Sequence, residues 1–211
     1  KSIKLITFGF TNEATINCKV FDEKKITIST PNENFDVKIN LLGKSNIKNI
    51  LAACACSYAL EIPVSIMKKG IEAIKPFPGR LENIISSNGV TVINDSYNAN
   101  PTSMKEAVDV LANMKGLKIL VIGDMAELGN DTNKYHKELG EYIKTSQIDF
   151  TLAVGRHTKI TMQQLGNEKL WFETKEALVN KLLKIMKPKS TILVKGSRFM
   201  EMEEVVNKII L

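Results

Sequence analysis

Residues 90–101 read VTVINDSYNANP, a short apolar run that gives way to polar residues and then to a proline. The apolar run at the start of this stretch predicts a strand that is buried on both faces. The pair Asn100-Pro101 predicts the start of a helix, because proline fits the first helical turn, and Ser103 with Glu106 fits a capping box. A strand that leads through a polar loop into a helix is the repeating unit of an α/β domain.

The same succession of strand, loop and helix continues through the rest of the chain. Segments with apolar residues at helical spacing separate the strands. We therefore predict an α/β domain over residues 79–211, with a mostly parallel sheet and helices on both faces. Four further apolar runs typical of buried strands lie at residues 119–122, 151–154, 170–172 and 191–194.

The first 78 residues follow a different pattern. Apolar and polar residues alternate in four segments, which predicts a half-buried antiparallel sheet. Two helices are expected after it, at residues 46–60 and 63–74. The pattern changes at Pro76-Phe77-Pro78-Gly79, so we predict two domains that meet near residue 78. The four alternating segments are residues 4–10, 16–21, 25–29 and 35–41.

Composition limits the classes of function. The apolar fraction of 44% and the charged fraction of 25% are ordinary for a globular protein. No apolar run approaches the roughly 20 residues of a membrane helix, so no membrane insertion is expected. The net charge of +6 is spread along the chain, and aromatic residues make up only 6%, so nucleic-acid binding is not expected. Cys18, Cys54 and Cys56 suggest neither a disulfide framework nor a metal pair, which fits the reducing cytoplasm.

Unusual polar residues cluster where the predicted strands end. The loops read DSYNANP at residues 95–101, GDMAELG at 123–129, GRH at 155–157 and KGSR at 195–198. Open parallel sheets bind ligands beyond the carboxyl ends of their strands, so this edge is the predicted site.

Several residue types at this edge suit a nucleotide and an acidic substrate. The carboxylate of Asp95 can accept hydrogen bonds from both hydroxyls of a ribose. The guanidinium of Arg80 suits phosphate oxygens, although a plain loop arginine paired with Glu82 is the alternative. Lys195, Ser197 and Arg198 can together hold a substrate carboxylate. His136 is a further substrate-binding candidate, or else a residue of a helix end.

No triphosphate cradle accompanies these loops. Gly43-Lys44-Ser45 looks like the end of a P-loop, but Lys38 stands where the first glycine of that motif belongs. We therefore predict neither a phosphate cradle nor a metal site in this chain.

Four motifs, in this order, resemble the Mur ligase family over essentially the whole chain. They are PGRLE at 78–82, DSYNANP at 95–101, GDMAELG at 123–129 and LVKGSR at 193–198. The resemblance points to the branch that adds D-alanyl-D-alanine. The stretch LGKSNIKN at 42–49 is similar to a G-x-H-N-x-x-N segment of the family, with Ser45 in place of the usual histidine.

This resemblance implies an ATP-dependent amide ligase of peptidoglycan precursor synthesis in the cytoplasm. Its partners would be UDP-N-acetylmuramoyl-tripeptide and D-alanyl-D-alanine, with ATP and Mg²⁺ as cofactors. Residues 1–78 would be the C-terminal part of the central ATPase domain, and residues 79–211 the Rossmann-like C-terminal domain. The P-loop and the metal ligands lie upstream in the family, so this fragment alone is expected to be inactive.

The resemblance also implies roles for individual residues, although it assigns no catalytic residue within this chain. Nucleotide contacts would come from Asn46 and Asn49 at the adenine, Arg80 at the phosphates, Asp95 at the ribose, and Tyr97 and Asn98 beside them. Lys195, Ser197 and Arg198, with His136, would contact the substrate. Two alternatives stay open: another ligase of this type, such as a folylpolyglutamate synthase, or a non-catalytic nucleotide-binding module.

Overall fold

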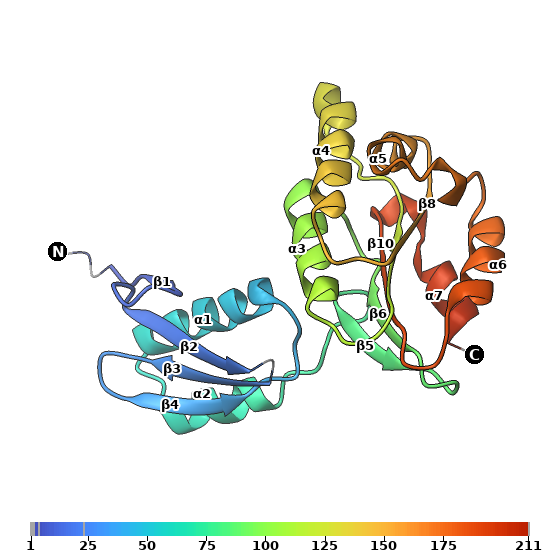
Figure 1. Ribbon diagram of the computed structural model, residues 1–211. Coiled ribbons are helices and arrows are strands. Elements are labelled where there is room, and N and C mark those ends of the chain that lie inside the picture. Colours follow the sequence, from blue (N-terminus) through green and yellow to red (C-terminus); the bar gives the residue numbers. More distant parts are fainter. Residues whose placement is uncertain (1–2, 4, 23, 211) are drawn as a thin grey trace. The chain divides into compact units, whose positions relative to one another are not determined.

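The computed structural model of the chain describes residue 3, residues 5–22 and residues 24–210. The chain forms two compact units, residues 1–76 and residues 77–211 (Figure 1). Within the described ranges, no helix has the length and apolar character needed to cross a bilayer.

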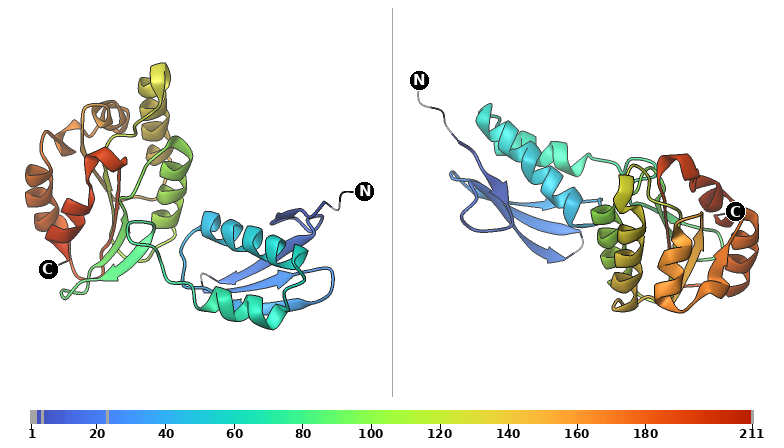
Figure 2. Two further views of the ribbon diagram at one scale, coloured as in Figure 1. Left: turned by 180° about the vertical axis from the view of Figure 1, so that it is seen from behind. Right: turned by 90° about the horizontal axis from the view of Figure 1, so that it is seen from above.

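The first unit is a four-stranded sheet with two helices packed on one face (Figure 2). Ile26, Ile28 and Leu51 are fully buried between the sheet and the helices. Strand residues alternate between buried and exposed positions, as expected for a sheet that is covered on one side. In the order β1-β2-β3-β4 the strands are Phe8–Gly9, Ile16–Asp22, Lys25–Ser29 and Asn34–Lys38, and the helices are α1, Lys44–Ala59, and α2, Val64–Glu72.

One strand of this unit differs from the prediction. The pairs β2–β3 and β3–β4 are antiparallel as expected, but β1 and β2 are parallel. The chain returns to the start of β1 before β2 begins: Thr15 N donates to Thr7 Oγ1 at 2.9 Å, and Ile16 N donates to Thr7 O at 2.9 Å. Of the strand predicted at residues 4–10, only β1 forms, and Lys4 lies outside the described residues.

The second unit contains a six-stranded sheet in the order β5-β6-β10-β7-β8-β9. All neighbouring strands are parallel except β5 and β6, so the predicted α/β class with a mostly parallel sheet is confirmed. The central strand β10 is buried along its whole length. The strands are β5 Glu82–Ile85, β6 Thr91–Asp95, β7 Lys118–Ile122, β8 Phe150–Val154, β9 Trp171–Phe172 and β10 Thr191–Lys195.

Helices cover both faces of this sheet, with α3 and α4 on one side and α6 and α7 on the other (Figure 1). Val92, Val121 and Val194 pack against Val205 and Val206 in one of the two core layers. The helices are α3 Pro101–Ala112, α4 Thr132–Lys144, α5 Thr158–Leu165, α6 Lys175–Ile185 and α7 Glu203–Ile209, with 3₁₀ turns at Gly129–Asp131, Glu168–Leu170 and Arg198–Met200.

The polar loop after β6 ends in the helix cap of α3. Asn100 is the N-cap and Pro101 follows it, as predicted. The capping box, however, joins Asn100 to Ser103: Ser103 N donates to Asn100 Oδ1 at 2.9 Å, and Asn100 N donates to Ser103 Oγ at 3.0 Å. The predicted capping box of Ser103 with Glu106 is wrong, because Ser103 occupies the third helical position rather than the N-cap.

Candidate functional site

The site in the second unit is built where β6, β7 and β10 end. Lys195 and Asp95 are the last residues of two neighbouring parallel strands and face each other in register. The loops that leave these strands contain the motifs DSYNANP, GDMAELG and KGSR. The structure therefore brings three separate sequence motifs to one edge of the sheet.

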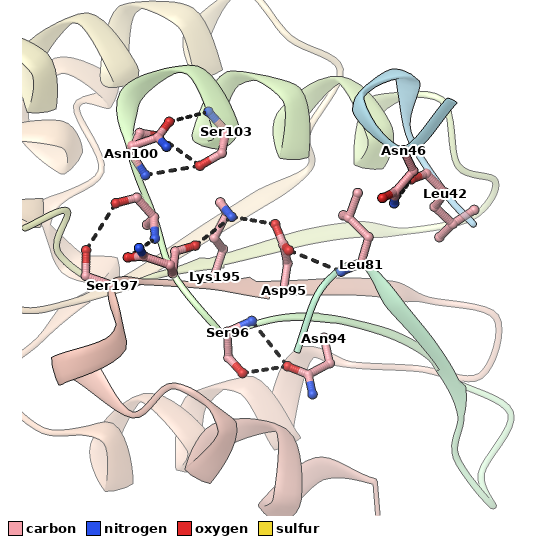
Figure 3. A network of polar contacts seen from close by, with 12 residues as sticks. Leu42, Asn46, Leu81, Asn94, Asp95, Ser96, Asn100, Ser103, Lys195 and Ser197 are labelled. Carbon is pink, nitrogen blue, oxygen red and sulfur yellow. Dashed lines mark hydrogen bonds and ion pairs between the residues drawn. The ribbon is translucent and has the colours of Figure 1, made fainter. Parts of the chain in front are cut away.

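A buried ion pair lies at the centre of this edge. Lys195 Nζ is 2.6 Å from Asp95 Oδ2, and the two side chains are only 4% and 12% exposed. Lys195 Nζ also donates to Asn98 O at 2.8 Å, and Leu81 N donates to Asp95 Oδ1 at 3.1 Å (Figure 3). Both carboxylate oxygens of Asp95 thus have partners within the protein. The predicted roles, ribose for Asp95 and dipeptide for Lys195, stay predictions.

Burial raises the pKa of the Asp95 carboxyl above its ordinary value. The Lys195 ammonium, the hydrogen bond from Leu81 and the charge of Arg80 each act in the opposite direction. Such a pair depends on both partners, because either charge alone would be buried without compensation. The pair therefore fixes the ends of β6 and β10 against each other.

Ser197 connects three loops. Its hydroxyl accepts a hydrogen bond from Ala126 N at 2.7 Å and donates to Ala99 O at 3.2 Å. Its backbone N–H donates to Asp124 O at 2.9 Å. Since Ser197 is only 1% exposed and its hydroxyl is fully engaged, its position favours a structural role in this edge.

Arg80 and Tyr97 form an exposed layer outside the buried pair. Arg80 Cζ lies 4.2 Å from the centroid of the Tyr97 ring, and the Phe77 ring meets Tyr97 edge-on at 6.0 Å. Gly79 makes this approach possible: its φ of +74° suits glycine, and a Cβ there would lie 3.3 Å from Tyr97 N. The Arg80 guanidinium is thereby held over an aromatic face with its donors toward solvent.

The alternative pairing of Arg80 with Glu82 is not what the structure contains. Glu82 Oε2 accepts hydrogen bonds from Gly79 N at 3.2 Å and from Asn94 Nδ2 at 3.1 Å. Glu82 thus holds the loop that carries Arg80.

Two further predicted contacts, Asn98 and Arg198, are exposed. Asn98 Oδ1 accepts a hydrogen bond from Ala99 N at 2.8 Å, which ties the amide group of this exposed residue to the turn. Arg198 is 59% exposed at its side chain and pairs with Glu203 at 2.6 Å. Phe199 beside it is 62% exposed. Arg198 is therefore the one member of the predicted substrate set Lys195, Ser197 and Arg198 that reaches solvent.

His136 is completely buried. Its Nε2 accepts a hydrogen bond from Met125 N at 3.3 Å, and its Nδ1 lies 3.3 Å from Thr161 Oγ1. Burial lowers the pKa of His136, so the neutral ring is favoured. Its position favours support of the GDMAELG loop, and its substrate contact stays a prediction.

The remaining predicted nucleotide contacts, Asn46 and Asn49, lie in α1 of the first unit. Asn46 Nδ2 donates to Leu42 O at 2.7 Å (Figure 3), and Asn49 is exposed one turn later. Gly43, with a φ of +86°, precedes the helix. Both side chains share a helix face by their spacing, and their adenine contact stays a prediction.

An open cavity of about 530 Å³ borders the loops of the second unit. Its lining combines carboxylates, an amide, a hydroxyl and a phenol. Among the residues that the structure describes, no three His, Cys, Asp or Glu side chains come together as a metal site. The cavity is lined by Asn100, Pro101, Thr102, Glu127, Leu128, Asp131 and Tyr135.

Sequence reasoning did not reveal how the exposed arginines are held. Glu203 pairs with Arg198, and Glu82 braces the Arg80 loop. For Glu203 a signal was present: an acidic residue at the first position of a helix, five residues after an arginine in the preceding loop.

Comparison with known proteins identifies the family. Residues 79–198 match the glutamate ligase domain of the Mur ligases, and residues 1–57 match the Mur ligase middle domain. The chain is 41% identical over 186 residues to UDP-N-acetylmuramoyl-tripeptide–D-alanyl-D-alanine ligase of Escherichia coli, which covers 86% of this chain and 40% of the relative.

Solved structures agree with this assignment. MurF from Acinetobacter baumannii superposes with a TM-score of 0.89 at 29% identity, over 97% of this chain and 46% of that one. MurF of Thermotoga maritima in complex with ADP has a TM-score of 0.80 at 22% identity, over 96% and 47%, and shows a common fold. The chain thus spans less than half the length of these relatives. With more than half of its residues matched by the glutamate ligase domain, the chain belongs to the Mur ligase family.

Proposed function

We propose that this chain is part of an ATP-dependent ligase that joins D-alanyl-D-alanine to UDP-N-acetylmuramoyl-tripeptide in peptidoglycan precursor synthesis. Residues 1–78 would belong to the central ATPase domain and residues 79–211 to the C-terminal domain. The proposed compartment is the cytoplasm. The relatives' shared name supports this substrate choice.

One structural observation carries the proposal. Arg80 and Arg198 are exposed at one sheet edge, on loops braced by the buried Asp95–Lys195 pair. Two fixed guanidinium groups suit two anions, the phosphates of ATP and the carboxylate of an amino-acid acceptor.

The proposed reaction has two steps. An oxygen of the tripeptide carboxylate attacks the γ-phosphorus of ATP, which forms an acyl phosphate and releases ADP. The amine nitrogen of D-alanyl-D-alanine then attacks the acyl carbon, loses a proton and displaces phosphate, which leaves a new amide. Catalysis of this kind relies mainly on positioning and charge stabilisation.

Residues of this chain would bind and orient the reactants. Arg80 would contact the phosphates, with Tyr97 supporting its guanidinium, and Asn98 would border the nucleotide. Asn46 and Asn49 would contact the adenine. We assign no step to Mg²⁺, because its ligands would lie in the upstream part of the ligase, as the family resemblance implies.

The test is acceptor-dependent phosphate release by the full-length ligase. ATP and UDP-N-acetylmuramoyl-tripeptide would be offered with D-alanyl-D-alanine, D-glutamate, L-alanine or diaminopimelate. We expect release only with D-alanyl-D-alanine. Release with another acceptor would overturn the proposed substrate and keep the ligase class.

A second experiment separates the ligase from a non-catalytic nucleotide-binding module. We expect Arg80→Ala to reduce turnover at least about tenfold, because a charge-assisted contact to the reacting phosphates is lost. Asp95→Ala should also reduce turnover at least about tenfold, because it breaks the pair with Lys195 that holds the loops of the site. Lys137→Ala, which removes an exposed pair on α4, is the matched control. Unchanged turnover in Arg80→Ala would favour the module.

A further inference from the structure

We infer that Glu203 is a positioning residue that holds Arg198 ready for the carboxylate of the incoming dipeptide. The inference rests on the proposed function, because it concerns how the amine substrate of that reaction is recognised. Three observations lead to it: the burial of the other candidate groups, the geometry of the Arg198–Glu203 pair, and the way in which the surrounding loop is anchored.

Burial distinguishes the three carboxylate-binding candidates Lys195, Ser197 and Arg198. Lys195 Nζ already contacts Asp95 Oδ2 and Asn98 O, and its side chain is 4% exposed. The Ser197 hydroxyl is used by two backbone groups. Arg198, in contrast, is mostly exposed, and its contact with Glu203 uses only part of the guanidinium, which has five N–H groups.

The Arg198–Glu203 pair is asymmetric. Glu203 Oε1 lies 2.6 Å from Arg198 Nη2, and the Glu203 side chain is about half as exposed as its partner, at 31% against 59%. The other oxygen, Glu203 Oε2, is buried and has no hydrogen-bond partner among the described residues. Glu203 is therefore the fixed member of the pair, and Arg198 is the member that projects from it.

The segment between Arg198 and Glu203 is anchored both by apolar packing and by polar contacts. Met202 is fully buried, and a Cβ at Gly196 would lie 2.7 Å from Met202 Cγ, so only glycine allows this packing. Lys175 on α6 donates to Met200 O at 3.0 Å and pairs with Glu204 at 2.7 Å. Neither end of the segment can shift without disturbing a packed group.

This arrangement reduces the conformational freedom that Arg198 would lose on binding. A free arginine side chain loses rotamer entropy when it is fixed, and a guanidinium that is already oriented loses less. The Glu203 charge also weakens the attraction for a second carboxylate, so the benefit of Glu203 is orientation. If Arg198 loses its orientation toward the dipeptide, we expect the KM for the dipeptide to rise.

The test compares single and double variants of the full-length ligase with D-alanyl-D-alanine as the varied substrate. We expect Arg198→Ala to raise its KM about a hundredfold and Glu203→Ala about tenfold, with kcat and the KM for ATP nearly unchanged. Arg198→Ala combined with Glu203→Ala should be no worse than Arg198→Ala alone, because Glu203 acts through Arg198. Glu203→Asp, which keeps the carboxylate, should raise the KM for the dipeptide less than Glu203→Ala does. Glu141→Ala, which removes an exposed ion pair of α4, is the matched control.

An analogue without the carboxylate provides a readout that a merely structural role would not change. D-alanyl-D-alaninamide should be a poorer acceptor for the unmodified ligase, and neither Glu203→Ala nor Arg198→Ala should make it poorer still. Near-UV circular dichroism of each variant would establish that the fold is retained, and Glu203→Gln provides a second variant of nearly unchanged shape.

Four results would overturn the inference. The first three are an unchanged dipeptide KM in Glu203→Ala and Glu203→Gln, additive effects in the double variant, and an equal loss with the amide analogue. The fourth is a rise in the KM for ATP alone, which would assign Arg198 to the nucleotide. Failure of the proposed function is distinguishable, because it would appear in the unmodified ligase as absence of dipeptide-dependent phosphate release.

Discussion

Two ion pairs lie at the same edge of the second unit's sheet, and their surroundings differ. The pair Asp95–Lys195 is buried and each partner has additional hydrogen bonds within the protein. The pair Arg198–Glu203 is much more exposed, and its arginine projects into solvent. The comparison shows that charged residues in neighbouring motifs serve different purposes: the inner pair joins strands and loops, whereas the outer pair presents a cation.

The distinction also explains why the inner residues are held so firmly. Gly79, Leu81 and Asn98 all lie on loops that contact the inner pair or its immediate neighbours. Arg80 and Tyr97 lie on these same loops, and Arg198 lies on the loop that directly follows Lys195. The inner pair therefore sets where the outer groups point, and breaking it should affect stability first.

The largest expected effect is loss of stability when the inner pair is broken. Asp95→Ala or Lys195→Met should lower the free energy of unfolding by about 3 kcal/mol, because one charge is left buried without its partner. The double change Asp95→Leu with Lys195→Met should cost less than the sum of the single changes. Urea unfolding of the 211-residue chain, followed by circular dichroism, measures both. Equal stability of the single variants and the unmodified chain would remove the distinction between inner and outer pairs.

An intermediate loss of stability is expected at acidic pH, because of the buried residue His136. Burial lowers the pKa of His136, so the unfolded chain takes up the proton first as the pH falls below about 6.5. The contribution of the neutral histidine is thus present above this pH and is lost as the pH falls toward the lowered value. Unfolding free energies at pH 7 and pH 5 measure the loss.

Histidine substitutions separate this effect from titrating carboxylates. His136→Gln keeps an acceptor for Met125 N and should reduce the pH dependence between pH 7 and pH 5. The chain has two histidines, and the half-buried His157 lies beside His136, so His157→Gln is the control. If the pH dependence disappears only in His157→Gln, then His157 causes the effect and the prediction for His136 is wrong.

The smallest expected effect on stability comes from the outer pair. Arg198→Ala and Glu203→Ala should leave the urea midpoint of the chain unchanged within error, because exposed ion pairs contribute little to folding. This result would contrast with their expected effect on the KM for the dipeptide. A large loss of stability in Arg198→Ala would show that the outer pair, like the inner one, holds the fold together.

The sequence allowed the main architecture to be predicted, because buried parallel strands form continuous apolar runs. The run at residues 191–194, for example, corresponds to β10. The strand β5 and the helix α5 were not predicted. β5 is an edge strand with exposed residues such as Ile85, and α5 is a polar helix with the sequence TKITMQQL. Neither has a clear apolar period, so periodicity gave no signal.

The sequence allowed us to predict that the polar motifs share one edge of the sheet, but it did not reveal their partners within the protein. Polar residues follow several predicted strands, and in the structure the loops after β6, β7 and β10 do meet at one edge. The pairing of Asp95 with Lys195, however, depends on β10 lying beside β6, although the two residues are far apart in the chain. Strand order is a tertiary property, and local patterns carry no information about it. The same limit applies to the exposure of Arg198, which follows from the anchored loop around it.

The position of β10 between β6 and β7 has a consequence for biosynthesis. β10 is the last strand along the described chain, yet it occupies the middle of the sheet. Until residues 191–195 have left the ribosome, β6 and β7 each present an open edge of unpaired backbone groups. The nascent unit therefore consists of two partial sheets that a late strand must join, and any delay or truncation before that point exposes two sites for aggregation.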